Sequence, residues 1–526
     1  MLRGRLVDRS EFMRKTVCHF LLGRLCWLLA LVSAFVPTVV QAEGPMQWTT
    51  PAQIPYSDPG VNTPSLLADA SGTVHAFSSQ KIAGTFSRVI MYNRWQRDTG
   101  WSKPVDILIS PLHDEAHAPA AFLDSKGTIH LVFFGGHDVS ANIYYASAPA
   151  LRADDATAWS PPVAIATGAR PPITVWIAGD LDDNLYVLFG GNLDGTGIYS
   201  LESNDGGTTW SLPEMLFGTY SETLWPYSLR MLYGESGRLY AIWNVLNRRA
   251  WGSAAYFTTF DFTTHRWNEP QLVAEGVEGG ILGVQSLSML EFKGELFLMY
   301  DNGIPEQGVV RLVRRSDDGG RSWSQAVRPF PEHVGGNGPS AFVADSSGQL
   351  HVFFGQRTQG TAAQQRHGMW YSEWHEQVRS WGGVHDIISG PLIQDVDGDK
   401  GFDPSAANAV TVQGNLLMVV WRTDPGNGNN GAWYSYTELD TPTTAAVPLP
   451  TLTPTALPVK VTRQLLPTPT PTLSPLMLAA EEPTHTTPIR TLTNPAAPLL
   501  AGLIPVSLFL VAMMYHLNRR HYRRRY

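Results

Sequence analysis

The stretch Ser203-Asn-Asp-Gly-Gly-Thr-Thr-Trp210 (SNDGGTTW) is nearly repeated at Ser316–Trp323, as SDDGGRSW. Both copies belong to a longer series, because a tryptophan followed by a polar or small residue recurs at intervals of 51 to 58 residues. The members of the series are Trp48, Trp101, Trp159, Trp210, Trp267, Trp323 and Trp381. A nearly constant period of this length indicates a repeat architecture, in which each copy has a structural role.

Each period contains the same order of elements. Two apolar runs flank a polar turn with glycine, as in AAFLDSKGTIHLVFF (120–134) and AFVADSSGQLHVFF (341–354). Aspartate or serine followed by glycine between two β-rich runs is typical of a hairpin. A third, aromatic run follows, then the turn with tryptophan, then a short fourth run. Four antiparallel strands in every ~55 residues are typical of the blades of a β-propeller.

Seven such units lie between Pro64 and Thr437. The last unit has no closing strand of its own, whereas WTTPAQI (48–54) precedes the first unit. We therefore expect the N-terminal strand to complete the last blade, which would leave no exposed sheet edge. The sequence predicts an all-β protein with a seven-bladed propeller at 43–439. Six blades with an outlying sheet is the alternative.

The two octapeptides resemble the Asp-box, or BNR repeat, of sialidase-like (neuraminidase-like) propellers. The matching positions are Ser203, Asp205, Gly207 and Trp210 in one copy and Ser316, Asp318, Gly320 and Trp323 in the other. The resemblance implies a propeller fold, which binding proteins and glycoside hydrolases share. The residues themselves indicate a structural turn, because Asp can accept backbone N–H groups, Gly permits positive φ and Trp supplies packing surface.

The composition and the two chain ends predict an exported protein. Only 16% of the 526 residues are charged and the net charge is −8, which gives no sign of a nucleic-acid surface. Both cysteines, Cys18 and Cys26, lie in the N-terminal segment 1–42, where basic residues precede an apolar run. This pattern is typical of a signal peptide, with a retained membrane anchor as the lesser alternative. Residues 440–495 form a Pro/Thr-rich stalk, 496–516 an apolar transmembrane helix and 517–526 a basic cytoplasmic tail. We therefore predict a monomer with a single membrane span and an extracytoplasmic propeller.

Ligands are expected at the end of the propeller opposite the tryptophan turns, in the loops before each first strand and after each second strand. These loops carry carboxylates, imidazoles, guanidinium groups and aromatic rings, a mixture that suits a sugar or an acidic ligand. The candidate ligand-binding residues are His113, Asp114, His137, Arg170, Trp225, Tyr227, Arg248, Arg249, Arg357 and Arg422.

The resemblance also implies a catalytic pattern, and this chain departs from it. Sialidases of this kind hold the substrate carboxylate with three arginines, and they use a Tyr–Glu pair as the nucleophile and an Asp as the acid/base. The position that matches the first arginine reads Asn62-Thr63-Pro64, and the second matches Asn244. The pair Tyr300-Asp301 is similar to the Tyr–Glu pair with a shorter acid. Candidate catalytic residues are Glu222, Asp301, Tyr300 and Asp58.

Two patterns bear on metals and on the core. Asp395, Asp397, Asp399 and Asp403 stand at alternate positions, as in a calcium loop, but the glycine comes one residue late, so a solvated acidic turn stays open as the alternative. No cofactor other than this calcium is expected. His75, His130 and His351 occupy one repeat position that tyrosine, phenylalanine or leucine fills elsewhere, which predicts core histidines.

The sequence therefore favours a cell-surface, membrane-anchored propeller that recognises glycans. The alternative is a glycoside hydrolase with a rearranged carboxylate site. A structural or protein-binding ectodomain stays open as a third interpretation.

Overall fold

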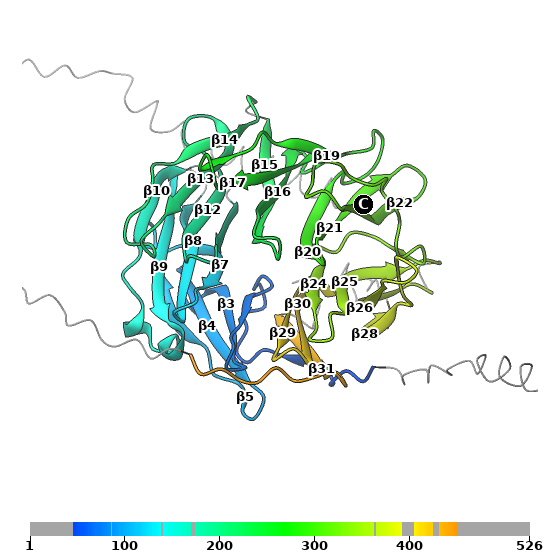
Figure 1. Ribbon diagram of the computed structural model, residues 1–526, viewed down its shortest axis with the longest axis horizontal. Coiled ribbons are helices and arrows are strands. Elements are labelled where there is room, and N and C mark those ends of the chain that lie inside the picture. The colour runs from blue at the N-terminus through cyan, green and yellow to red at the C-terminus, as the bar shows by residue number, and fades with distance from the viewer. Residues whose placement is uncertain are drawn as a thin grey trace, which may run out of the picture. The chain divides into compact units, whose positions relative to one another are not determined.

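The structure, a computed structural model, describes residues 46–449 apart from Phe86, 138–139, 170–173, Glu222, 362–363, 392–403 and 424–430. Seven antiparallel sheets follow one another around a common centre (Figure 1). This arrangement confirms the all-β, seven-bladed propeller, and the six-bladed alternative is wrong. We number the blades 1 to 7 in chain order.

Each blade begins with its innermost strand and proceeds outward. The first strands are β2 (Ser65–Ala68), β7 (Ala116–Leu123), β11 (Thr174–Gly179), β15 (Leu224–Tyr233), β20 (Gln285–Phe292), β24 (Ala341–Ala344) and β29 (Pro404–Val412). The second strands are β3 (Val74–Lys81), β8 (Thr128–His137), β12 (Leu185–Asn192), β16 (Leu239–Asn247), β21 (Glu295–Ile304), β25 (Leu350–Thr358) and β30 (Leu416–Thr423). The third strands are β4 (Arg88–Gln96), β9 (Ser140–Pro149), β13 (Thr196–Ser203), β17 (Gly252–Asp261), β22 (Gly308–Ser316), β26 (Arg366–His375) and β31 (Ala432–Glu438).

The outer strands are shorter and less regular. They are β6 (Val105–Ile109), β10 (Val163–Ala169), β14 (Glu214–Gly218), β19 (Gln271–Glu275) and β28 (His385–Pro391), and in blade 5 a single bridge joins Val313 to Val327. Two-residue strands and two short 3-10 helices complete the structure: β5 (Gly100–Trp101), β18 (Arg266–Trp267), β23 (His333–Val334), β27 (Ser380–Trp381), η1 (Ala150–Arg152) and η2 (Ala156–Ala158).

The N-terminal strand closes the ring, as predicted. Strand β1 (Ala52–Gln53) pairs with β31, so that Ala52 lies opposite Tyr434. The pairing continues on both sides, where Thr49 N donates to Tyr436 O at 2.9 Å and Ile54 N donates to Ala432 O at 2.8 Å. Blade 7 is therefore built from both ends of the propeller sequence, which leaves no unpaired edge at β31.

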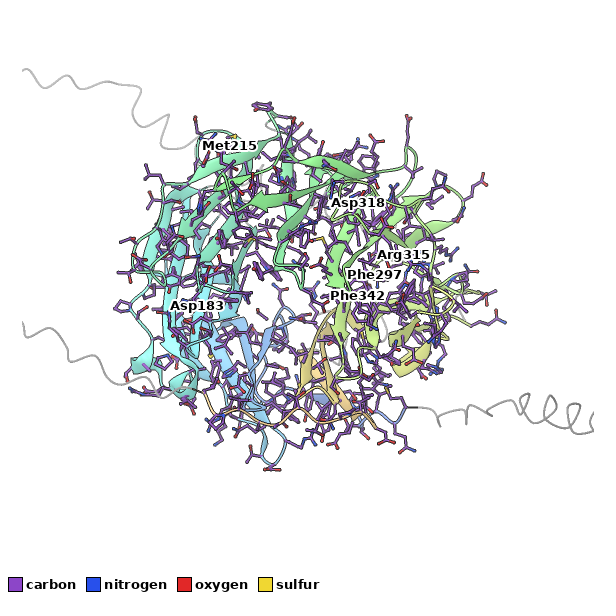
Figure 2. All side chains as sticks on the ribbon, viewed as in Figure 1. Asp183, Met215, Phe297, Arg315, Asp318 and Phe342 are labelled. Atoms are coloured by element: carbon purple, nitrogen blue, oxygen red, sulfur yellow. The ribbon has the colours of Figure 1, made fainter. Side chains whose placement is uncertain are left out.

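The octapeptide turns use the predicted hydrogen bonds. In blade 3, Asp205 accepts from the backbone N–H of Thr209 at 2.8 Å and from its hydroxyl at 2.6 Å, while Ser203 Oγ accepts from Gly207 N at 2.9 Å. Blade 5 repeats this set around Asp318, which Figure 2 labels. These bonds stabilise the ionised carboxylate, and they lower the pKa of Asp205.

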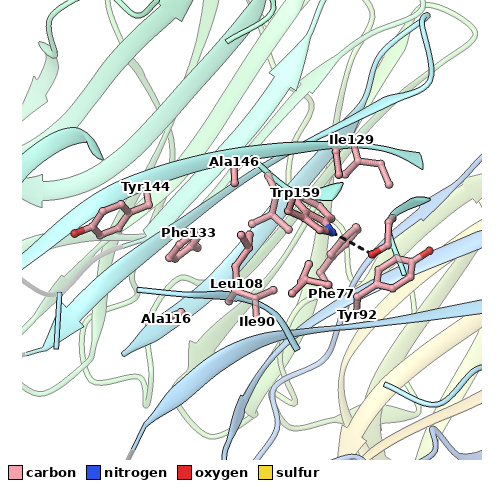
Figure 3. Close-up of a cluster of buried hydrophobic side chains, with 14 of the residues drawn as sticks. Phe77, Ile90, Tyr92, Leu108, Ala116, Ile129, Phe133, Tyr144, Ala146 and Trp159 are labelled. Atoms are coloured by element: carbon pink, nitrogen blue, oxygen red, sulfur yellow. Dashed lines mark hydrogen bonds between the residues drawn. The ribbon is translucent and has the colours of Figure 1, made fainter. Parts of the chain in front are cut away.

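The series tryptophans join each blade to the one before it. Trp210 of blade 3 packs edge-on against Tyr145 of blade 2, with ring centres 5.1 Å apart, and Trp323 packs against Phe257 of the preceding blade at 5.2 Å. Trp159 meets Phe77 at 6.0 Å in the core between blades 1 and 2 (Figure 3). The near-constant spacing of tryptophan in the sequence thus follows from the repeated contact between neighbouring sheets.

The core histidines are buried as predicted, and each lies between an aspartate and a tyrosine. His75 is 1% exposed, and its ring contacts Tyr92 Oη at 2.8 Å and Asp69 Oδ2 at 3.1 Å. His130 lies between Asp124 and Tyr145 in the same way. His351 has the same neighbours in Asp345 and Tyr371. A neutral imidazole satisfies both neighbours, because one nitrogen can donate to the carboxylate while the other accepts from the phenol.

The segment after β31 lies against the propeller. Thr444 N donates to Gln413 O and Val447 N donates to Ala70 O, both at 2.8 Å. The first ten residues of the predicted stalk therefore contact the turns between first and second strands. No helix in the described part of the chain is long and apolar enough to cross a membrane. The predicted signal peptide (1–42), the rest of the stalk (450–495), the helix (496–516) and the tail (517–526) lie outside the described residues.

Candidate functional site

The antiparallel strands give the propeller two different ends. The turns between first and second strands share one end with the tryptophan turns; we call this the turn end. The loops before the first strands and after the second strands share the other, which we call the loop end. At the turn end, neighbouring blades bond directly, since Asp183 of blade 3 accepts from Ser125 N at 2.9 Å and from Ser125 Oγ at 2.7 Å. The loop end is where the sequence predicts the ligand.

Four innermost strands contain a bulge at the loop end. The pairing with the second strand shifts between His117 and Ala120, between Tyr227 and Arg230, between Gln285 and Ser288, and between Ser405 and Asn408. Each bulge holds one non-glycine residue at positive φ: Ala118 (47°), Ser228 (50°), Ser286 (58°) and Ala406 (54°). Such residues are strained, and bulges of this kind redirect nearby side chains, often at binding sites. The bulges therefore mark this end of the inner strands as the candidate site.

Blade 2 brings together two of the predicted imidazoles. The rings of His113 and His137 stack with their centres 4.2 Å apart. Beside them, His117 Nε2 lies 2.6 Å from Glu115 Oε2, and both side chains are about one-quarter exposed. Burial lowers the pKa of His117, and Glu115 opposes this shift. The pair can hold or move one proton at the surface of the loop end. Asp114 is exposed beside this group and adopts positive φ (52°).

Blade 4 carries the predicted aromatic residues and an arginine that sequence reasoning missed. Tyr227 is 45% exposed and Trp225 is partly buried. Three residues after Tyr227, Arg230 places its guanidinium carbon 4.7 Å from the ring centre of Trp176 on β11 of blade 3. Its Nη1 donates to Leu229 O at 2.9 Å. A single charged residue in the largely apolar run LWPYSLRMLY (224–233) was the sequence signal for it.

The other arginine candidates are spread around the loop end. Arg248 and Arg249 are exposed in the turn after β16. Arg357 lies beside Gly335 in blade 6. Arg422 Nη1 donates to Asn62 Oδ1 at 3.0 Å, which joins blade 7 to blade 1. The structure does not bring these four arginines into one cluster.

Tyr300 and Asp301, the candidate nucleophile pair, are both buried on β21. They are consecutive on β21, so their side chains point to opposite faces of the sheet. Tyr300 packs in the apolar core between blades 4 and 5. Asp301 is fully buried and accepts from Arg311 Nε at 2.9 Å and from Nη2 at 3.1 Å, while Nη2 also donates to Gly338 O of blade 6. Burial raises the pKa of Asp301, and the guanidinium opposes this.

The position that matches the second sialidase arginine has a structural role. Asn244 is fully buried and donates from Nδ2 to Val284 O of blade 5 at 2.7 Å. Ser79 at the same repeat position donates to Ala116 O of blade 2 at 2.7 Å. These second-strand residues hold the backbone just before the next blade. Asp58 has a comparable local role, because its carboxylate accepts from Gly60 N at 3.2 Å and from Lys81 N at 3.3 Å.

Several predicted residues lie outside the described part of the chain. They are Arg170, Glu222 and the proposed calcium ligands Asp395, Asp397, Asp399 and Asp403. Within the described part, no group of three or more His, Cys, Asp or Glu side chains could hold a metal ion. The calcium loop thus stays a prediction.

No family model and no curated protein match this chain. Solved structures match it at low identity. A protein of unknown function from Dyadobacter fermentans is 14% identical over 75% of this chain and 99% of its own, with a TM-score of 0.45. A PL25 ulvan lyase bound to -[GlcA(1-4)Rha3S]- is 12% identical over 74% and 95%, with a TM-score of 0.48. The intramolecular trans-sialidase from Ruminococcus gnavus is 14% identical over 72% and 94%, with a TM-score of 0.40. At this level the matches say nothing about activity, which has to be argued from the residues of the chain.

Proposed function

We propose that the propeller recognises glycans at its loop end and that the predicted terminal segments hold it on the outside of a membrane. The observation that carries the proposal is the group formed by Tyr227, Arg230 and Trp176, where two innermost strands meet. Sugar sites combine aromatic surface with a few oriented polar groups. Here an exposed phenol, a guanidinium and an indole come from neighbouring blades, and a bulge lies between the first two.

The state of the candidate catalytic residues favours recognition over hydrolysis. A glycosidase of the common type needs two carboxyl groups that flank the scissile bond. Asp301 is committed to a buried bidentate pair with Arg311, and Tyr300 faces the core. Asn62 and Asn244 stand where the resembling enzymes have arginines, and Asn244 is itself committed to the backbone of blade 5.

A glycoside hydrolase with a rearranged site is the second candidate. The observation that favours it is the pair Glu115–His117, which leaves a carboxylate and an imidazole in contact and partly exposed at the loop end. Such a pair could serve as a general acid or base.

We further propose that the two octapeptides are Asp-box turns and that the protein is sialidase-like in this structural sense. The identical hydrogen bonds around Asp205 and Asp318 support this.

The predicted membrane tether is compatible with ligand binding at the loop end. The chain runs along the turn end at Thr444 and Val447 after its last strand, so a tether that begins there would leave the loop end free for ligands.

A glycan array with the purified full-length protein tests the proposal. Bound sugars are then titrated against Tyr227→Ala, which we expect to weaken binding about 3- to 10-fold, as for loss of one aromatic contact. Leu181→Ala removes another exposed side chain (82% exposed), but at the turn end, and serves as the matched control. Absence of any bound glycan would refute the proposal. Turnover of an aryl-sialoside that Glu115→Gln abolishes would support the hydrolase instead.

A further inference from the structure

We infer that the segment 331–339, at the loop end between blades 5 and 6, is an acid-sensitive latch. The latch is closed while His333 is neutral, and it opens locally when this side chain takes up a proton. Its strand β23 pairs with the last residues of β25, which places it at the loop end. The inference goes beyond the proposed function and does not depend on it, because no ligand takes part.

His333 is a buried histidine without the partners that the core histidines have. It is 6% exposed, and its ring packs edge-on against Trp370 and Phe354, with ring centres 4.7 Å and 5.8 Å apart. Neither ring nitrogen has a hydrogen-bond partner in the described part of the chain. His75 and His130, by contrast, each contact an aspartate and a tyrosine. A buried imidazole without partners has lost its hydrogen bonds to water, so the closed latch holds His333 at a cost in free energy.

The surroundings of His333 oppose its protonation. Burial comes first, and the cations Arg311 and Arg328 add to it, so that the pKa of His333 is lowered to about 4. Arg328 Nη2 donates to His333 O at 3.0 Å, which fixes this charge to the latch. A proton on His333 would add a further cation to a layer in which the carboxylate of Asp301 is already paired with Arg311. The other charged or titratable side chains at this end of the surrounding segments are the exposed Glu332, Arg357 beside Gly335, and Arg366 and His367 on β26.

The latch joins three blades at the loop end. Gly335 N donates to Val309 O of blade 5 at 2.7 Å, and Gly335 O accepts from Gln356 Nε2 of blade 6 at 2.7 Å. Asn337 Nδ2 donates to Pro404 O of blade 7 at 3.1 Å. Opening of the latch would break these bonds, so it would loosen the loop end while the strand pairs of the blades stay intact.

Two features favour the open state once His333 is charged. Gly335, Gly336 and Gly338 follow it, and glycine gives the opened backbone many conformations. Arg311 and Gln356 both donate to backbone carbonyls of the latch, and each also has a buried polar atom without a partner, Nη1 and Oε1 respectively. Water could satisfy these atoms in the open state.

The pH window follows from the preference of the closed state for neutral His333. The advantage of the closed state is complete above a pH of about 6.5, the ordinary pKa of histidine, and it is lost as the pH falls towards 4. Each pH unit in this window should raise the equilibrium constant for opening about tenfold, and the whole window should raise it about 300-fold.

Hydrogen exchange of the full-length protein between about pH 4 and 7.5, followed by mass spectrometry, tests the latch. Measured rates are divided by the intrinsic amide rate at each pH, which leaves the protection of each segment. The variants are His333→Phe and His333→Gln, neither of which can take up a proton at this position. His265→Phe is the control, because it removes a 65% exposed imidazole at the turn end. Strand β12, which has no histidine or carboxylate, is the reference segment.

We expect the protection of 331–339 in the wild type to fall about 100- to 300-fold between pH 7.5 and 4, while that of β12 changes less than about threefold. In His333→Phe and His333→Gln the protection of 331–339 should also change less than about threefold, because the proton has no site in the latch. His265→Phe should behave as the wild type does.

Three outcomes would overturn the inference. Equal protection of 331–339 in the wild type at both ends of the pH range would show that the segment does not open in acid. A loss of protection that persists in both His333 variants would assign the effect to another group. A parallel loss in β12 would show that acid unfolds the propeller as a whole. Because no sugar is used, each of these results leaves the proposed function standing.

Discussion

The sharpest test of the blade-to-blade contact is a pair of alanine substitutions at adjacent glycines, Gly206→Ala and Gly207→Ala. Both glycines have positive φ, 68° and 85° respectively. A Cβ at Gly206 would meet nothing within 4 Å, whereas a Cβ at Gly207 would lie 2.1 Å from Tyr145 Oη and 2.2 Å from its Cζ. The backbone penalty is therefore shared, and only Gly207→Ala adds a clash with the preceding blade.

The expected magnitudes follow from these two contributions. An alanine in the left-handed region costs about 1–2 kcal/mol, so Gly206→Ala should lower the free energy of unfolding by about that amount. Overpacking adds about 1–3 kcal/mol, so the total loss for Gly207→Ala should be about 2–5 kcal/mol. Urea denaturation of the full-length protein, followed by tryptophan fluorescence, measures both values.

A double-mutant cycle isolates the clash. Tyr145→Ala removes the ring that a Cβ at Gly207 would meet, so Gly207→Ala should cost about 1–3 kcal/mol less in that background. The second octapeptide provides an independent copy, because a Cβ at Gly320 would lie 2.1 Å from Phe257 Cε1, while one at Gly319 would meet only the flexible end of Arg238. Equal losses for Gly206→Ala and Gly207→Ala, or a coupling near zero with Tyr145→Ala, would refute the reasoning.

Three further predictions concern stability. Arg311→Met leaves Asp301 buried without its partner and should lower the free energy of unfolding, measured by urea denaturation, by about 3–5 kcal/mol. The double variant Arg311→Met/Asp301→Leu should regain most of this stability. An unchanged urea midpoint for Arg311→Met would contradict the prediction. Burial raises the pKa of Asp345, but the adjacent His351, 3.4 Å away, and hydrogen bonds from Gln349 and Ser347 outweigh it and lower this pKa to about 2. The ionised carboxylate therefore stabilises the fold above about pH 4, and this contribution is lost as the pH falls towards 2, so Asp345→Asn should flatten the pH dependence of the urea midpoint in that window. Deletion of residues 46–54 removes β1 and exposes the edge of β31, which should produce aggregates in size-exclusion chromatography; a monomeric, equally stable product would show that closure is dispensable.

The fold was predictable because the same contacts between neighbouring blades recur and require the same residue types at a regular spacing in the sequence. Trp210 and Trp323 recur since each blade needs a large ring against its predecessor, and Trp48 precedes the first unit since β1 closes the last. The histidine network had a signal that periodicity alone did not use. An aspartate stands six residues before each of His75, His130 and His351, and a hairpin turn brings each pair together.

The site was less predictable, because it depends on register and on which donors stay free. Sequence reasoning expected the ligand at the loop end, which stays a prediction, and it named Asp301 as a candidate acid, which the structure shows paired with Arg311. Its cross-strand partner Arg311 becomes visible only once β21 and β22 are paired residue by residue. Arg230 was missed for a related reason. Its side chain reaches Trp176 of another blade, and the bulge that places it there leaves no mark in hydrophobic periodicity.

The two ends of the propeller differ in the regularity of their backbone. At the turn end, the carboxylates of Asp205, Asp318 and Asp183 accept hydrogen bonds from backbone and hydroxyl groups of the protein. A ligand would have to break these bonds to reach the carboxylates. At the loop end, strained bulges interrupt the regular pairing of four inner strands, and Tyr227 beside one of them is 45% exposed. Strain of this kind persists only where the surrounding sheets impose it. The regular turn end, which the octapeptides help to build, thus belongs to the surroundings that hold the loop end in its strained conformation.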